Sequence, residues 1–171
     1  MRVAILTISD AGARGERADG SGDAVAAWVA DRGHSLAARA LVPDDSVAIV
    51  RQLLDWCDGD QADLVLTTGG TGLSARDVTP EATRAVLERE APGLVERVRV
   101  STLDRFPRAA LSRAVAGSRH RTLMVNLPGS TGGVRDALAA LDPVVGHAVA
   151  VLRGDVTDHS GGVVRREGIA P

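Results

Sequence analysis

The sequence predicts one α/β domain, a three-layer sandwich in which helices cover both faces of a mainly parallel central sheet. Short apolar runs typical of buried strands alternate with segments whose apolar residues recur at helical spacing. The 171 residues suffice for one such domain and fall short of the length at which a second core is expected. Aromatic residues make up only 2% of the chain, so Val, Leu, Ile and Ala must fill the core, which suits a tightly packed parallel sheet.

The first half of the chain is expected to supply three strands and two helices. In order, these are a strand at residues 2–8, a Gly-, Asp- and Arg-rich loop from 9 to about 22, a helix that ends at Gly33, a strand at 35–42, a helix with the apolar stripe Val47, Val50, Leu54 and Cys57, and a strand at 63–68. The turn at residues 43–46 combines with an N-cap to open the second helix. The run at 63–68 predicts a central strand buried on both faces.

The second half is expected to add mainly helices around one more strand. Pro80 suits the first position of a helix behind a Thr79 cap, and more helix is expected from Gly93 to about Arg105. Residues 122–127 read as another buried strand, and Pro143 is expected to separate two closing helices. We therefore divide the chain into a domain at 1–153 and a polar C-terminal tail at 154–171, which we expect to be mobile.

Charge and composition exclude several classes of protein. A formal net charge of -2 and the shortage of aromatic rings argue against a nucleic-acid partner. No apolar run is long enough to span a bilayer, and the lone Cys57 cannot form an internal disulfide, so we expect a cytoplasmic protein with no membrane partner. Every basic side chain is Arg, and the absence of Lys removes a Walker-type phosphate loop and Schiff-base chemistry.

Polar loops follow the predicted strands at the edge where α/β proteins bind ligands. Ser9 and Asp10 follow the first strand, Asp44 follows the second, the loop Gly69, Gly70, Thr71 and Gly72 follows the third, and the loop from Asn126 through Pro128 and Gly129 to Ser130 follows the last. In a parallel sheet the carboxyl ends of the strands lie at one edge, and ligands gather there. These four points are therefore expected to lie together.

The segment TTGGTGLSARDVTPEA at residues 67–82 carries the strongest signal for a phosphate site. Its closely spaced glycines let backbone amides approach an anion, and Thr68 and Thr71 add hydroxyl donors. A tight strand-to-helix connection would account for the same glycines without any ligand. Neither GxxxxGK[ST] nor GxGxxG is present, which disfavours a P-loop and a dinucleotide-binding unit.

Two aspartates accompany this glycine-rich loop and suggest a magnesium site. Asp77 follows the loop directly, and Asp44 is expected at the same sheet edge. Mg²⁺ is usually held by one or two carboxylates together with phosphate oxygens and water, which matches this supply of ligands. Two structural roles stay open at this point, because Asp44, like Asp45 or Ser46, could cap the following helix and Asp77 could be a turn residue.

The sequence offers no candidate for covalent catalysis. Cys57 lies on a predicted apolar stripe, Ser9 lacks a G-x-S-x-G elbow, and the 4 histidines show no metal-ligand spacing. The chemistry therefore points to positioning and charge neutralisation around a phosphate.

Two long motifs, TTGGTGLSARDVTPEA and NLPGSTGGVRDAL at residues 126–138, closely resemble the MoaB/Mog family of molybdopterin-binding proteins. The opening Ile8-Ser9-Asp10, the turn Val42-Pro43-Asp44-Asp45 and the stretch from Leu111 to Gly117 are also similar, so the resemblance covers about residues 1–153. One departure is Thr131, where many relatives carry proline.

The resemblance implies a homotrimer of three-layer α/β domains that adenylylates molybdopterin with Mg²⁺ and ATP. It implies that the glycine loop and the loop from Asn126 to Ser130 hold pterin and nucleotide phosphates, and that Asp44 and Asp77 are the acidic residues needed for the transfer. The product would pass to a separate molybdenum-inserting enzyme. The alternatives are a paralogue that binds molybdopterin or a precursor without adenylylating it, and an assembly subunit with a vestigial pocket. Retention of both aspartates favours the enzyme.

Overall fold

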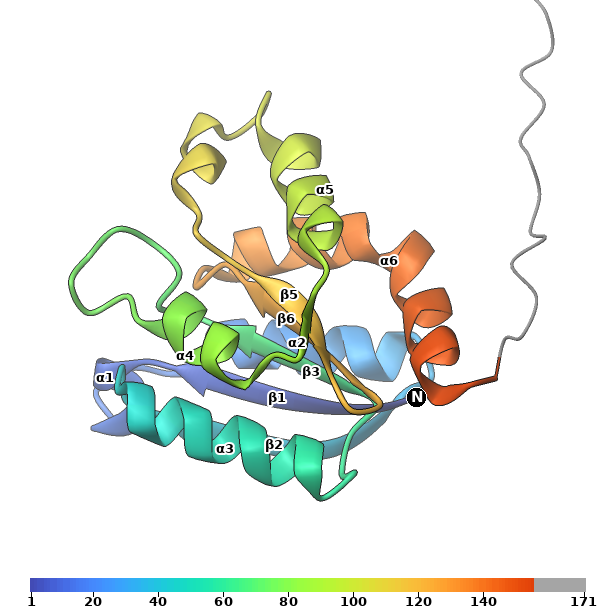
Figure 1. Ribbon diagram of the computed structural model, residues 1–171. Coiled ribbons are helices and arrows are strands. Elements are labelled where there is room, and N and C mark those ends of the chain that lie inside the picture. The colour runs from blue at the N-terminus through green and yellow to red at the C-terminus, as the bar shows by residue number, and fades with distance from the viewer. Residues whose placement is uncertain (156–171) are drawn as a thin grey trace, which may run out of the picture.

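The computed structural model describes residues 1–155, which fold around a single six-stranded sheet (Figure 1). The strands are β1 (Arg2–Ile8), β2 (Ser35–Val42), β3 (Leu64–Thr68), β4 (Arg89–Glu90), β5 (Ala116–Arg119) and β6 (Thr122–Leu127). The helices are α1 (Asp10–Ala13), α2 (Gly20–Asp31), α3 (Ser46–Asp58), α4 (Thr79–Val86), α5 (Pro92–Thr102) and α6 (Thr131–Arg153), with a 3₁₀ turn η1 (Pro107–Leu111).

The sheet is mainly parallel, as the sequence predicts. Its strand order is β2-β1-β3-β6-β5-β4, and the four strands from β2 to β6 are parallel to their neighbours. The strands β4 and β5 are antiparallel additions at the far edge and were not predicted from the sequence. They are short, at two and four residues, and a segment of that length gives no alternation to detect.

Two apolar cores lie on opposite faces of the sheet and make the molecule three-layered. Along β1, Val3 and Ile5 pack on one face with α2, α5 and α6, while Ala4 and Leu6 pack on the other with α3 and α4. All four side chains are fully buried, which explains why β1 reads as a continuous apolar run. The expected three-layer α/β class is therefore confirmed.

Two predicted helix starts are wrong. The segment at 9–22, expected as a loop, contains α1 and the first residues of α2, whose N-cap is Asp19 rather than a residue after Gly22. In α4 the N-cap is Val78 and Thr79 already lies in the helix, because its hydroxyl donates to the carbonyl of Gly69 at 2.9 Å instead of capping.

The last two predicted helices form one continuous element, α6, with Pro143 inside it. Figure 1 shows α6 changing direction along its length, and an internal proline is a usual cause of such a bend because it removes one backbone hydrogen bond. The other helix bounds differ less, since α5 ends at Thr102 instead of about Arg105.

The buried face of α3 differs from the predicted apolar stripe. Its buried residues are Ile49, Leu53, Trp56 and Cys57. Val47 is 64% exposed, so of the predicted set only Cys57 is fully buried. The expectation of a packed thiol is confirmed, and burial raises the pKa of Cys57 to about 11.

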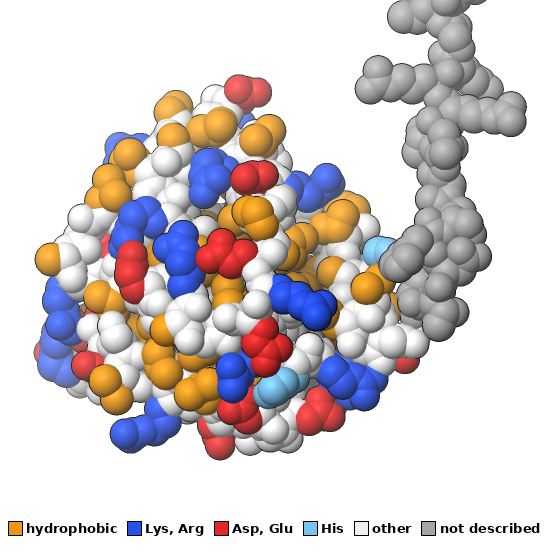
Figure 2. Space-filling model, in the orientation of Figure 1, with side chains coloured by type: hydrophobic (Ala, Val, Ile, Leu, Met, Phe, Trp, Pro, Cys, Tyr) orange, Lys and Arg blue, Asp and Glu red, His pale blue; other side chains and the backbone are white. Residues whose placement is uncertain are grey.

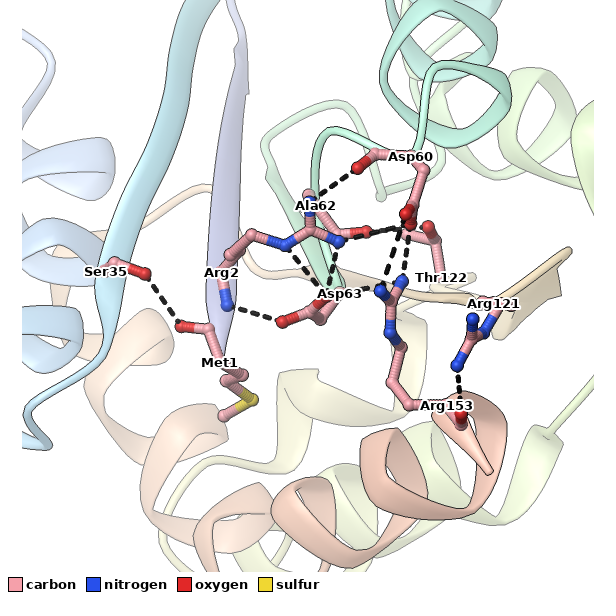
Figure 3. A network of polar contacts seen from close by, with 9 residues as sticks. All are labelled: Met1, Arg2, Ser35, Asp60, Ala62, Asp63, Arg121, Thr122 and Arg153. Atoms are coloured by element: carbon pink, nitrogen blue, oxygen red, sulfur yellow. Dashed lines mark hydrogen bonds and ion pairs between the residues drawn. The ribbon is translucent and has the colours of Figure 1, made fainter. Parts of the chain in front are cut away.

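Ion pairs close the sheet edge at which the parallel strands begin (Figure 3). Arg2, at the start of β1, bonds Asp63 at 2.8 Å and Asp60 at 3.1 Å. Arg153, at the end of α6, reaches the same two carboxylates. The opposite edge, where the strands end, is left for the polar loops.

Among the helices of residues 1–155, none is long and apolar enough to cross a membrane. The face seen in Figure 2 carries acidic and basic side chains interspersed rather than one basic field. Beyond Asp155, the expected mobile tail lies outside the described residues.

Candidate functional site

A polar cleft of about 460 Å³ lies at the carboxyl ends of β1 and β3. Six of the sequence-predicted residues line it, namely Ser9, Asp44, Gly69, Gly70, Asp77 and Gly129. The expectation that loops from separate strands meet at one edge of the sheet is therefore confirmed.

The loops approach so closely that glycine is required at two positions and favoured at a third. Gly69 has a φ of +100°, and a Cβ there would lie 2.2 Å from the carbonyl oxygen of Ile8. At Gly70, with φ +62°, a Cβ would lie 2.4 Å from the Thr79 hydroxyl. A Cβ on Gly129 would lie 3.2 Å from the Cα of Gly69, so the two predicted phosphate loops cross in backbone contact.

Asp10 and Asp44 lock the ends of β1 and β2 together. The Asp44 carboxylate accepts the N–H of Asp10 at 2.8 Å, and the Asp10 carboxylate accepts the N–H of Asp44 at 3.0 Å. Arg76, from the loop before α4, pairs with Asp10 at 2.7 Å. The hydrogen bonds from Arg76 hold the pKa of the Asp10 carboxyl below its usual value, with a smaller contribution from the Asp44 N–H.

The structure shows whether Asp44 is a helix cap and whether Asp77 is a turn residue. Asp45, and not Asp44, caps α3, because its carboxylate accepts the N–H of Ala48 at 2.8 Å. Asp77 is a turn residue as well as a cleft residue, since its Oδ2 accepts the N–H of Ser74 at 2.7 Å. Within residues 1–155, the Oδ1 atoms of Asp44 and Asp77 accept no hydrogen bond.

A second, mostly apolar pocket of about 220 Å³ lies on the other side of the crossing loops. Its predicted residues are Thr71, Gly72, Asn126, Pro128, Gly129 and Ser130, and its apolar wall includes Val95 and Val98 of α5, Phe106, and Leu111 of η1. Gly129 borders both pockets, while the glycine loop contributes Gly69 and Gly70 to the cleft and Thr71 and Gly72 to the second pocket. The two pockets therefore share a wall made of two glycine-containing loops.

Two predicted ligand-binding side chains direct their polar atoms into the protein. Thr68 is fully buried, and its hydroxyl donates to the carbonyl of Pro128 at 2.7 Å. Asn126 is 3% exposed and donates both amide N–H groups, to the Thr67 and Thr83 hydroxyls, at 2.9 Å each. Contrary to the sequence-based expectation, the Thr68 hydroxyl holds the loops together and does not face the cleft, whereas Asn126 lines the second pocket and its binding role stays a prediction.

Ser9 and Ser130 are helix caps at the rims of the two pockets. Ser9 accepts the N–H of Gly12 as the N-cap of α1, and Ser130 accepts the N–H of Gly133 as the N-cap of α6, each at 3.1 Å. Their hydroxyl protons make no hydrogen bond to protein within residues 1–155.

The segment from Arg17 into the start of α2 also lines the cleft, and the sequence motifs do not indicate it. Arg17, Asp19, Gly20 and Ser21 line the cleft, and Gly20 lies beside Thr131 at the start of α6. Asp19 is fixed there by Thr7 at 2.9 Å and Arg39 at 2.6 Å. Two helix N-termini thus face the cleft, and their dipoles favour an anion. The available signal was Asp19 as a cap ahead of the helical apolar spacing, which the Gly-rich composition obscured.

Comparison with known proteins assigns this fold and cleft to a family. The family described as "Probable molybdopterin binding domain" matches residues 4–147. The chain belongs to the MoaB/Mog family. The match spans both crossing loops and both aspartates, and it ends inside the domain expected at 1–153, whose boundary stays a prediction.

Individual MoaB/Mog relatives align over most of their length. A molybdopterin adenylyltransferase of Helicobacter pylori strain J99 is 36% identical over 161 residues, covering 91% of this chain and 89% of that protein. The Escherichia coli K12 protein of the same name is 37% identical over 152 residues, covering 87% and 77%. The crystal structure of the molybdopterin biosynthesis enzyme MoaB from Thermus thermophilus is 51% identical, with a TM-score of 0.85 and coverage of 90% and 96%.

Proposed function

We propose that this protein transfers an adenylyl group from Mg-ATP to molybdopterin in the synthesis of the molybdenum cofactor. The observation that carries the proposal is the shared wall between the two pockets, formed by Gly129 and the loop 69–72. A transfer reaction requires two ligands whose reacting groups meet, and glycines in the shared wall allow that close approach. Relatives named molybdopterin adenylyltransferase support the identity of the two substrates.

The polar cleft suits the phosphates of both substrates. The helix N-termini of α2 and α6 and the side chain of Arg17 attract anions there. The apolar second pocket suits a flat ring system, adenine or pterin, held next to those phosphates.

The donor set in the cleft fits Mg²⁺ when a phosphate is also bound. Within residues 1–155, Asp44 and Asp77 each keep one carboxylate oxygen that accepts no hydrogen bond. The same residues contain no group of three or more His, Cys, Asp or Glu side chains that could hold a metal by themselves, so the phosphate must supply further ligands. Two carboxylates completed by phosphate oxygens and water is a usual environment for this ion. When bound, Mg²⁺ would neutralise charge on the transferring phosphoryl group and on pyrophosphate.

The protein's own part in the reaction is to align and shield the two substrates. A terminal phosphate oxygen of molybdopterin forms a bond to the α-phosphorus of ATP while the bond from that phosphorus to the β-phosphate bridging oxygen breaks, releasing pyrophosphate. The crossing loops hold both groups in line, and no protein nucleophile takes part. Cys57, the only cysteine, is buried away from the cleft.

The proposal is tested by incubating the protein with molybdopterin, ATP and Mg²⁺ and measuring pyrophosphate and adenylylated pterin. We expect both products in equal amounts. Tight pterin binding with neither product would identify the chain as the non-catalytic binding paralogue. No binding at all would identify a vestigial pocket.

The proposal has three further features. They are, from family resemblance, a homotrimer and hand-over of the product to a molybdenum-inserting enzyme and, from the lone Cys57 and the lack of a membrane-spanning run rather than from resemblance, location in the cytoplasm. Each stays a prediction for this chain.

A further inference from the structure

Arg113 bridges the two ends of the loop that carries Asp77. Its Nε donates to the carbonyl of Gly72 at 2.6 Å, and one Nη2 N–H donates to the carbonyl of Asp77. The other terminal nitrogen pairs with Glu81 of α4, and the Arg113 backbone N–H donates to the carbonyl of Thr71 at 2.9 Å. One side chain therefore fixes the first and last residues of the segment 72–77.

We propose that Arg113 is a positioning residue that sets the place of the Asp77 carboxylate in the cleft, an inference that rests on the proposed adenylyl transfer. Asp77 binds the Ser74 N–H within the same loop, so the carboxylate moves with the loop as a unit. A planar guanidinium holds two carbonyls at a fixed separation, which a flexible ammonium group cannot do.

Another side-chain attachment of this loop is at Arg76. Arg76 makes a bidentate ion pair with Asp10 of α1, but its side chain is 64% exposed and the pair does not reach the carbonyls of Gly72 or Asp77. Arg113 has half that exposure, at 32%, and two of its three side-chain bonds go to backbone carbonyls.

Arg113 also connects the loop to the second pocket. Its neighbours Ser112 and Ala114 line that pocket, whereas Asp77 lines the cleft. Because one residue joins both walls, the position of the candidate metal ligand depends on the segment that borders the other substrate.

The test compares Arg113→Met and Arg113→Lys with two matched controls. Arg97→Met removes an Nε bond of the same length, to the Ala140 carbonyl, and neither of these two residues lines either pocket. Glu81→Gln removes only the charge that pairs with Arg113. Each variant is measured for kcat, KM for molybdopterin, and hydrogen exchange of the backbone amides at 73–77.

We expect Arg113→Met to lower kcat at least ~10-fold, with KM for molybdopterin within about 2-fold, because misplacing a reacting group affects rate more than binding. The amides at 73–77 should exchange at least ~10-fold faster, since their protection depends on the closed loop. Arg113→Lys should recover part of the kcat and part of the amide protection. The two controls should match wild type in kcat.

Faster exchange with unchanged kcat in Arg113→Met would overturn the proposal, as would an equal loss of kcat in Arg97→Met. If Arg113→Met does not fold, Arg113→Lys must show the kcat loss and the faster exchange together, and wild-type values for either would overturn the proposal. If wild type makes no adenylylated pterin, the proposed function fails, and exchange at 73–77 still decides whether Arg113 holds the loop.

Discussion

At the residue scale, the cleft depends on side chains that combine a structural bond with a free acceptor. Asp44 binds the Asp10 N–H and Asp77 binds the Ser74 N–H, each through Oδ2, which fixes the carboxylate and leaves Oδ1 for a ligand. The sequence predicts both aspartates at this edge. It cannot predict that Thr68 and Asn126 turn inward, because that depends on partners 60 and 59 residues away.

Replacing Asp77 with Asn should lower kcat by ~10²-fold while the protein stays folded. The Asn side-chain carbonyl still accepts the Ser74 N–H, so the variant removes the charge and keeps the loop. Steady-state kinetics at saturating Mg²⁺ measure the effect, and pterin binding should survive.

Asp45→Asn is the control for this substitution. It removes a neighbouring charge, and Asn caps a helix about as well as Asp, so rate and stability should both stay near wild type. A near wild-type rate in Asp77→Asn would show that the metal is bound elsewhere.

The buried thiol of Cys57 should make the folded protein less stable at alkaline pH. Burial raises the folded-state pKa of the thiol to about 11, above the unfolded value of ~8.5, so its contribution is complete below pH ~8.5 and disappears as pH rises toward 11. Urea unfolding should show the free energy of unfolding falling by on the order of 3 kcal/mol across that range.

The chain has no Tyr and no Lys, so Cys57 is the only side chain expected to titrate in this window. Cys57→Ala should therefore give a flat profile over the same range, at a lower overall stability. An unchanged slope in that variant would assign the alkaline loss to something other than the thiol.

At the element scale, prediction succeeds where periodicity is strong and fails where tertiary contacts decide. The runs at 2–8, 35–42 and 122–127 became strands with those bounds because their residues are buried on the sheet or alternate against it. Pro143 was expected to end a helix, but packing of residues such as Leu141 and Val145 on the core carries α6 through it. Such compensation is invisible in the local sequence.

The close approach of the glycine loop to the end of β1 should make Gly69→Ala strongly destabilising. The added Cβ would meet the Ile8 carbonyl, and the positive φ disfavours any L side chain, so we expect a loss of at least ~2 kcal/mol in the free energy of unfolding. Thermal or urea unfolding measures it.

Gly146→Ala is the matched control for this prediction. Gly146 is exposed in α6 with no atom within 4 Å of an added Cβ, so alanine should stabilise the protein by ~0.5–1 kcal/mol. A small effect of Gly69→Ala would show that the glycine loop can move away from β1 without cost.

At the scale of the whole molecule, the sequence predicts the three-layer α/β fold. The structure adds how the sheet edge at the carboxyl ends of the strands is built. One sheet edge is closed by the ion pairs of Arg2 and Arg153, and the other holds two pockets on either side of the crossing loops. The loops that border the second pocket could be predicted, but its apolar wall could not, because Val95 and Val98 of α5 and the side chain of Phe106 lie outside every motif.

Light scattering tests the predicted homotrimer. Exposed apolar side chains such as Val100 at 70% and Phe106 at 56% are available for subunit contacts. We expect a mass near three times the 17.7 kDa of the chain at micromolar concentration. A monomer under those conditions would remove the claim.

The most direct test of the account follows the α-phosphate of ATP. The protein is mixed with molybdopterin, Mg²⁺ and ATP labelled at the α-phosphorus, and the pterin product is separated and counted. If the shared wall between the pockets brings the two substrates together, the label moves to the pterin with release of unlabelled pyrophosphate. Retention of all label in ATP, with molybdopterin bound to the protein, would contradict the proposed adenylyl transfer.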